Sequence, residues 1–197
     1  MDITKVYTIL KKSLYIDIAQ TSGGGQWIGD QKAYYNVDGL PELDKDCILP
    51  LIGVDIDTKA KYNVSVCDMP YEEQVSASSA EGDGMIEPTS LIISGMAVFR
   101  GVGKNAPPCV FLNAAYLKPF SADGDISYIV RKVPNQAGYV ILVKRGLITI
   151  AFILPIIFSG NDMTSKLISD LENVIAAIKQ QQGKNDTEEH FQLSLPD

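Results

Sequence analysis

Histidine and cysteine are scarce in this chain of 197 residues, and their scarcity excludes several kinds of site. The one histidine, His190, rules out a histidine-based catalytic triad and a zinc site built from several histidines. The three cysteines, Cys47, Cys67 and Cys109, form no CxxC pair, and their odd number prevents complete disulfide pairing. This usage favours a reducing compartment. We therefore expect a cytoplasmic protein with no cofactor and no metal ion.

A hydrophobic run long enough to cross a membrane is also missing. The most apolar stretch, residues 146–158 (GLITIAFILPIIF), has thirteen residues, whereas a transmembrane helix needs about 20. Its β-branched and aromatic residues favour a buried strand, and residues 138–144 (GYVILVK) form a second such strand directly before it. The N-terminus lacks the basic start and apolar run of a signal peptide. We expect a β-hairpin here and no membrane association.

Positive charge is in deficit, because the chain carries a net charge of -7. Its bulk surface would repel nucleic acid, so any DNA contact requires a local basic face. The hydrophobic content of 46% and the charged content of 21% are typical of a soluble globular protein. The composition therefore predicts a folded globular protein and leaves its partners open, whereas the fold class, α+β, follows from the order of the predicted elements.

The order of predicted elements is repeated along the chain. Residues 2–14 have the apolar spacing of an amphipathic helix, and residues 15–20 alternate like a strand before a glycine break and a hairpin. Residues 110–120 predict a second helix, again followed by a strand and a hairpin, and a strand at 90–100 precedes it. We expect one domain at 1–160, built from two helix-plus-antiparallel-strand units at about 2–41 and 90–158.

The rest of the chain gives additions to these units. Residues 43–54 predict a short helix and residues 61–66 a strand. The acidic segment 68–88 has no periodicity and predicts a mobile loop. Residues 161–182 carry one apolar stripe and predict an extra C-terminal helix, and residues 183–197 predict a flexible tail.

The second unit resembles the closing unit of a bacterial DNA polymerase sliding-clamp domain. The resemblance lies in FLNAAYLKPF (111–120), in the following strand with Arg131, and in a last strand that ends in ILPI (153–156). It covers residues 110–158 and, more loosely, 2–41. It implies a DNA-clamp-like fold and a non-catalytic role in DNA replication or repair. The chain has the length of one such domain and not three, so a ring would require a homo-oligomer.

The resemblance also implies that the helices of the two units face DNA. Their polar faces carry four lysines that would neutralise phosphates without reading the base sequence. The alternative is that these helical faces are simply solvated. The four candidate DNA-binding residues are Lys5, Lys11, Lys12 and Lys118.

The tail ends in a peptide similar to the motif by which polymerases and repair proteins dock on the bacterial sliding clamp. It consists of Gln192, Leu193, Ser194, Leu195 and Pro196. The resemblance implies that the two leucines enter an apolar pocket while the glutamine makes a directional polar contact. Asp197 departs from the motif, because an apolar residue is expected there. The alternative is an apolar patch that folds back on the domain or has no fixed structure.

A different class of function is a small ligand-binding protein or a metal-dependent enzyme with a pocket at the first hairpin. Such a pocket would be lined by Asp17, Asp30 and Tyr34, and carboxylates including Asp38 would hold a divalent cation. The spacing of these acids matches no fixed ligand pattern, and solvated acids are the ordinary alternative.

Overall fold

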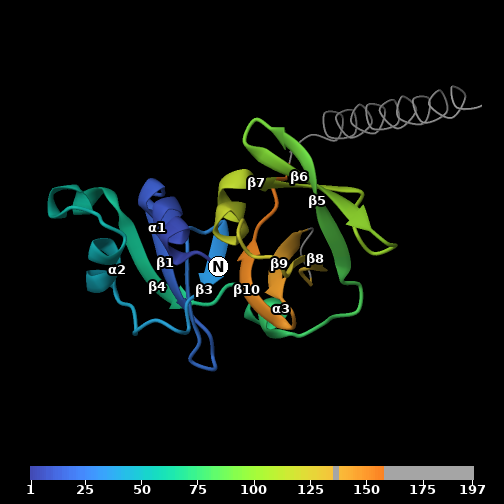
Figure 1. Cartoon of the computed structure of the whole chain (residues 1–197). Coiled ribbons are helices and arrows are strands. Elements are labelled where there is room, and N and C mark those ends of the chain that lie inside the picture. Colours follow the sequence, from blue (N-terminus) through green and yellow to red (C-terminus); the bar gives the residue numbers. More distant parts are fainter. Residues whose placement is uncertain (135–137, 158–197) are drawn as a thin grey trace, which may run out of the picture. The chain divides into compact units, whose positions relative to one another are not determined.

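The computed structural model describes residues 1–134 and 138–157 (Figure 1). Within it, Met1–Ile156 forms one compact unit. The predicted C-terminal helix at 161–182 and the tail at 183–197 lie outside the described residues.

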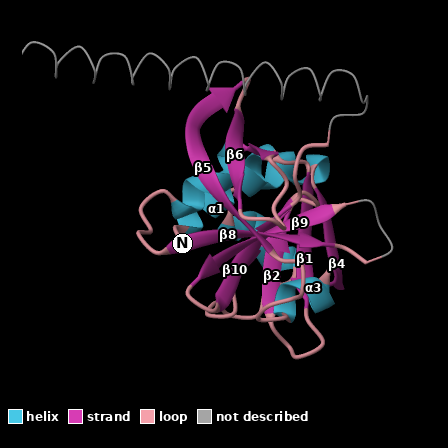
Figure 2. Ribbon diagram, turned by 90° about the vertical axis from the view of Figure 1, so that its right-hand side faces the viewer, coloured by secondary structure: helices cyan, strands magenta, loops and turns pink. Residues whose placement is uncertain are grey.

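Ten strands of the described chain form one continuous mixed sheet (Figures 1 and 2). Their spatial order is β4-β1-β2-β3-β10-β9-β8-β5-β6-β7. All neighbouring strands are antiparallel except β4 and β1, which are parallel. The strands are β1 (Tyr15–Gln20), β2 (Gln26–Gly29), β3 (Ala33–Asn36), β4 (Asn63–Asp68), β5 (Gly84–Ile93), β6 (Met96–Val102), β7 (Cys109–Asn113), β8 (Ile126–Lys132), β9 (Tyr139–Arg145) and β10 (Ile148–Ile153).

Short helices accompany the sheet. They are α1 (Ile3–Lys12), α2 (Lys45–Leu51), α3 (Glu72–Ser76) and the 3-10 helices η1 (Ile56–Lys61) and η2 (Ala114–Phe120). The Asp2 carboxylate caps α1 by accepting from the backbone N–H of Thr4 at 3.0 Å. None of the helices in the described ranges has the length and hydropathy needed to cross a membrane.

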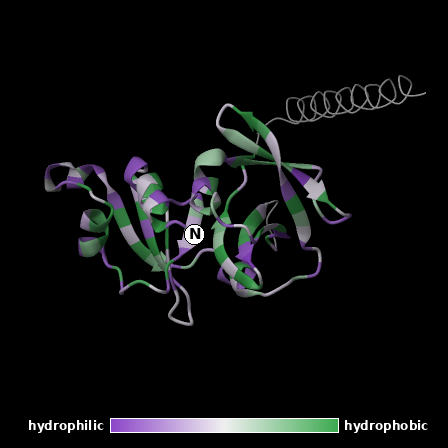
Figure 3. Cartoon of the chain, in the orientation of Figure 1, coloured by the Kyte–Doolittle hydropathy of each residue, from purple (hydrophilic) through white to green (hydrophobic). Residues whose placement is uncertain are grey.

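The predicted apolar hairpin is confirmed as β9 and β10, and both of its faces are buried. Ile141 and Val143 belong to one core cluster, with residues of α1, α2 and η2, whereas Val140 and Leu142 belong to a second cluster on the opposite face. A strand covered on both sides needs no polar face, which explains the continuous apolar run. Figure 3 shows much of this region in the green of hydrophobic residues.

The middle of the sheet joins the N-terminal and C-terminal parts of the compact unit. β3 pairs with β10, with Tyr35 opposite Ala151 and Tyr34 opposite Phe152. The Tyr34 ring stacks on Phe152 with a centroid separation of 4.9 Å. The pairing places strands β1–β3 and β8–β10 on either side of one seam.

The prediction of a duplicated, DNA-clamp-like fold is wrong. The second predicted helix, at 110–120, is mainly strand β7 followed by the seven-residue 3-10 helix η2. Val110 and Phe111 are β-branched and aromatic residues that pair with β6, and Pro119 lies inside η2. Since helices are few and short and the strands form a single mixed sheet, the units are not two helix-plus-strand copies.

The predicted strand at 90–100 is a hairpin of β5 and β6. Its turn lies at Ser94 and Gly95, both with positive φ. The pairing shifts register between Pro88 and Ile92, as at a β-bulge. Figure 2 shows that β5 is curved. Local sequence thus predicted the extended conformation but not the reversal of direction.

The predicted mobile loop at 68–88 contains helix α3 and the start of β5. The Arg131 guanidinium on β8 holds this segment: it donates to both oxygens of Asp83, at 2.7 and 2.6 Å, and to the carbonyls of Gln74 and Ala77. These bonds hold an acidic segment rich in small residues against the sheet. The hydrophobic periodicity of the segment could not predict them, because the donor, Arg131, lies on a distant strand.

Candidate functional site

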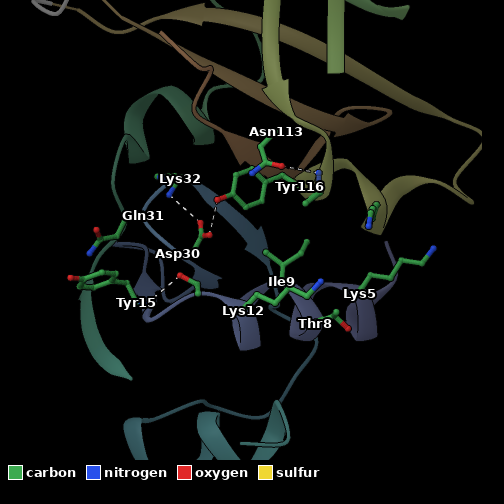
Figure 4. A pocket seen from close by; sticks show the side chains of 13 residues that line it. Lys5, Thr8, Ile9, Lys12, Tyr15, Asp30, Gln31, Lys32, Asn113 and Tyr116 are labelled. Carbon is green, nitrogen blue, oxygen red and sulfur yellow. Dashed lines mark hydrogen bonds between the residues drawn. The ribbon is translucent and has the colours of Figure 1, made fainter. Parts of the chain in front are cut away.

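A pocket of about 540 Å³ opens between α1, the turn from β2 to β3, and the segment from the end of β7 into η2 (Figure 4). We call it the lysine pocket. Its lining residues are Lys5, Thr8, Ile9, Lys12, Ser13, Tyr15, Asp30, Gln31, Lys32, Asn113, Ala115, Tyr116 and Lys118.

Helix α1 forms one wall of the lysine pocket. Val6 and Leu10 are buried in the core, and this orientation leaves Lys5, Thr8 and Lys12 on the pocket side. Lysines in the last turn also suit the negative end of the helix dipole. The amphipathic pattern of the sequence therefore sets the direction in which these cations point.

The N-terminus and η2 fix the distance between the two sides of the lysine pocket. The backbone N–H of Asp2 donates to the carbonyl of Pro119 at 2.8 Å, and the terminal ammonium of Met1 pairs with Asp123 at 2.7 Å. The Lys5 ammonium donates to Ser121 Oγ at 2.9 Å. α1 and η2 are thus tied together at one end of the pocket.

Asp30 and Tyr116 connect the walls at the centre of the lysine pocket (Figure 4). The Tyr116 hydroxyl donates to Asp30 Oδ2 at 2.8 Å, and Asp30 Oδ1 accepts from the backbone N–H groups of Lys32 and Ala33. Burial, and then the Asp30 charge, raise the pKa of Tyr116, so its phenol stays a neutral donor. Asp30 is therefore engaged in holding the turn and η2.

The charge of the lysine pocket is opposite to that of the whole chain. Four lysines against one aspartate leave three positive charges among its lining residues, whereas the chain carries -7. Lys5 also pairs with Asp2 at 3.6 Å. Within residues 1–134 and 138–157, the side chains of Lys12, Lys32 and Lys118 form no salt bridge and no hydrogen bond. These three exposed ammonium groups are available to an anion.

The structure brings three of the four predicted DNA-binding lysines together, because Lys5, Lys12 and Lys118 all line the lysine pocket. Lys11 points elsewhere: its ammonium donates to the carbonyl of Gly53 and lines a neighbouring depression of about 400 Å³. Lys32 was not predicted. It follows Asp30 in a hairpin turn, and nothing in the local pattern shows that this turn faces α1.

The carboxylates of the predicted hairpin site do not converge. Asp17 is buried and accepts from Ser65 and, at 2.6 Å, from the Tyr34 hydroxyl, while Asp38 caps the backbone N–H of Gln26. Of these acids, Asp30 lines the lysine pocket and Asp38 a separate one. The described residues contain no group of three or more histidine, cysteine or acidic side chains arranged for a metal ion.

The docking peptide at 192–196 lies outside the described residues, so its interpretation rests on the sequence. What the described geometry offers is a concave site with several unpaired cations, one exposed aromatic ring and amide side chains. Comparison of the chain with protein-family models, curated proteins and solved structures finds no match.

Proposed function

We propose that this protein is a non-catalytic, DNA-binding accessory protein of DNA replication, repair or mobile-element maintenance. The lysine pocket holds the phosphate backbone, and the C-terminal peptide docks on a bacterial sliding clamp. The observation that carries the DNA-binding part is the gathering of Lys5, Lys12, Lys32 and Lys118 at one concave site of an acidic chain.

The spacing of the lysines supports contact with a polymer. Lys5 and Lys12 are seven residues apart on α1, which corresponds to about 10.5 Å along the helix axis. Adjacent phosphates along one strand of B-DNA are about 3.4 Å apart along the duplex axis. The two lysines therefore reach different phosphates, and Lys32 and Lys118 add contacts from the other walls.

Phosphate contacts of this kind give affinity without base specificity. A protein that binds in this way gains from a second attachment that brings it to its place of action. The peptide Gln192–Pro196 would supply this attachment, with Leu193 and Leu195 as the apolar anchors. The function is tethering, with no reaction catalysed by the protein itself.

The DNA-binding part is tested with the double variant Lys12→Gln/Lys118→Gln. Its control, Lys104→Gln/Lys132→Gln, removes the same charge at exposed lysines outside the lysine pocket. Binding is measured by fluorescence anisotropy of labelled DNA over a range of salt concentrations. The slope of log K against log salt concentration should be smaller in magnitude by about 1.4 to 1.8 for the pocket variant than for the unmodified protein, because two phosphate contacts are lost. Equal slopes for the two double variants would remove the assignment of the site.

The docking part has its own test. A synthetic peptide of residues 188–197 should bind a purified bacterial sliding clamp, and the variant with Leu193→Ala and Leu195→Ala should not. Isothermal titration calorimetry measures both. Absence of binding by the unmodified peptide at high micromolar concentration would remove the clamp partner and leave the DNA-binding proposal intact.

A second candidate function is the binding of a small anionic ligand. It is favoured by the volume of the lysine pocket, which lies within the range of about 300–1,000 Å³ found for small-molecule sites. Titration with free thymidine monophosphate and with oligonucleotides of increasing length separates the two. Saturable micromolar binding of the mononucleotide with no gain from length supports this function, whereas affinity that grows with length supports DNA.

A further inference from the structure

Tyr15 provides the lysine pocket with an aromatic surface. The residue opens β1, its side chain is 50% exposed, and it lines the pocket together with Gln31 and Lys32. In Figure 4, Tyr15 and Gln31 lie at one end of the site and Lys5 at the other. Exposed aromatic rings beside cations are the combination by which proteins hold unpaired bases, since every base has a face that stacks.

The dimensions of the lysine pocket favour a single strand over a duplex. A cavity of about 540 Å³ accepts a ligand of small-molecule size. The major groove of a duplex alone is about 12 Å wide, and its bases are stacked inside. A duplex would therefore touch only the rim, whereas an unpaired nucleotide enters with its base and its phosphate.

Amide groups at the lysine pocket suit the polar edges of a base. Asn113 uses its side-chain oxygen to accept from the backbone N–H of Ala115 at 3.0 Å, which leaves its NH₂ group as a donor. Gln31 is exposed and has a φ of 72°, in the left-handed region that residues with a side chain rarely adopt. Strain of this kind is found at binding sites, where it presents a side chain in a fixed place.

We propose that the lysine pocket takes an unpaired nucleotide of single-stranded DNA, with the base stacked on Tyr15 and the flanking phosphates held by Lys12, Lys32 and Lys118. This inference rests on the proposed DNA-binding function and specifies its ligand. Binding of a base by stacking is tolerant of sequence, so the protein recognises exposed single strands and not a particular site.

The test uses the full-length protein and three labelled probes: single-stranded dT20, the dT20·dA20 duplex, and a 20-mer with abasic residues that keeps all phosphates. Tyr15→Ala should weaken dT20 binding about tenfold and leave the binding of the abasic strand unchanged. Tyr15→Phe keeps the ring and should retain the affinity. The control is Tyr139→Ala, at a tyrosine that is 37% exposed outside the pocket.

The outcomes separate the two proposals. Tighter binding of dT20 than of the duplex and the abasic strand, lost in Tyr15→Ala, supports the inference. Equal affinity for dT20 and the abasic strand, or equal behaviour of Tyr15→Ala and Tyr139→Ala, overturns it. In that event the Lys12→Gln/Lys118→Gln variant tests the proposed DNA-binding function separately. If this variant binds DNA more weakly than the unmodified protein, the pocket binds phosphates without stacking a base. Circular dichroism of each variant verifies that the fold is intact.

Discussion

Replacing Arg131 with methionine should remove the anchor of the segment between α3 and β5. The Arg131 side chain is 3% exposed and its guanidinium makes two hydrogen bonds to the Asp83 carboxylate, with further bonds to the carbonyls of Gln74 and Ala77. Methionine fills a similar volume but donates nothing. The substitution therefore isolates the loss of the charged hydrogen bonds from the loss of packing.

The expected loss of stability follows from the Asp83 carboxylate, which the substitution leaves without its charged partner. Removing one partner of a buried ion pair costs about 3–5 kcal/mol, because the remaining charge stays buried. The Asp83 side chain is 18% exposed and regains some water once it is released. We therefore expect the free energy of unfolding to fall by about 3 kcal/mol, at the lower end of that range.

Urea denaturation measures this loss, with the fluorescence of Trp27 as the probe. Trp27 is the single tryptophan of the chain, it is buried, and it packs near Phe152. For an unfolding slope of about 2–3 kcal/mol per molar urea, the midpoint should fall by about 1–1.5 M.

The matched control is Arg100→Met, which breaks an exposed pair with Glu87 and should cost no more than about 1 kcal/mol. An Arg131→Met midpoint no lower than that of the control would refute the reasoning, because it would mean that the buried guanidinium contributes no more than a surface charge.

Three further perturbations test other parts of the structure. Partial burial acts to raise the pKa of Asp83, but hydrogen bonds from Arg131 outweigh it and hold the pKa below its ordinary value. The resulting stability is present above the unfolded pKa of about 3.9 and is lost as the pH falls through the folded value. Urea midpoints should therefore drop below about pH 4, and Asp83→Asn should flatten this dependence; an unchanged profile would contradict the assignment. Tyr34→Phe should cost about 1–3 kcal/mol by urea denaturation, because buried Asp17 loses a donor, and a neutral effect would show that water replaces it. Gln31→Gly should raise the free energy of unfolding by about 1 kcal/mol in thermal melts by relieving its positive φ, and a loss of stability would show that the side chain supports the turn.

Local pattern predicted the elements whose cause is local. The amphipathic spacing at 2–14 gives α1, and the apolar runs around Gly146 give the β9–β10 hairpin, with the turn at Gly146 and Leu147. The helix predicted at 110–120 failed because its residues have a mixed pattern, and pairing with β6 decided in favour of a strand. That pairing depends on residues elsewhere in the chain, which periodicity within a short window does not contain.

Only part of the candidate site could be predicted, because its residues come from segments that are distant in the sequence. The clamp resemblance drew attention to the lysines of two expected helices, and the structure places three of them, Lys5, Lys12 and Lys118, around one pocket. That they bind DNA stays a prediction. Lys32 was missed, because the β2–β3 turn that carries it is held beside η2 by contacts such as the hydrogen bond between Asp30 and Tyr116, residues 86 positions apart. Tyr15 was missed, because the alternating pattern of β1 does not show that its first residue lines a pocket. The charge of each side chain follows from its residue type, whereas the proximity of these side chains depends on the tertiary fold.

The seam between β3 and β10 has a consequence for biosynthesis. Tyr35 and its partner Ala151 are 116 residues apart, so the first strands leave the ribosome long before the strand that completes the sheet. Until then β3 presents unsatisfied backbone groups that invite pairing with other nascent chains. The pairing of β3 with β10 must therefore wait until Ile153 has left the ribosome, and a chain released before that point would retain an unpaired edge at β3.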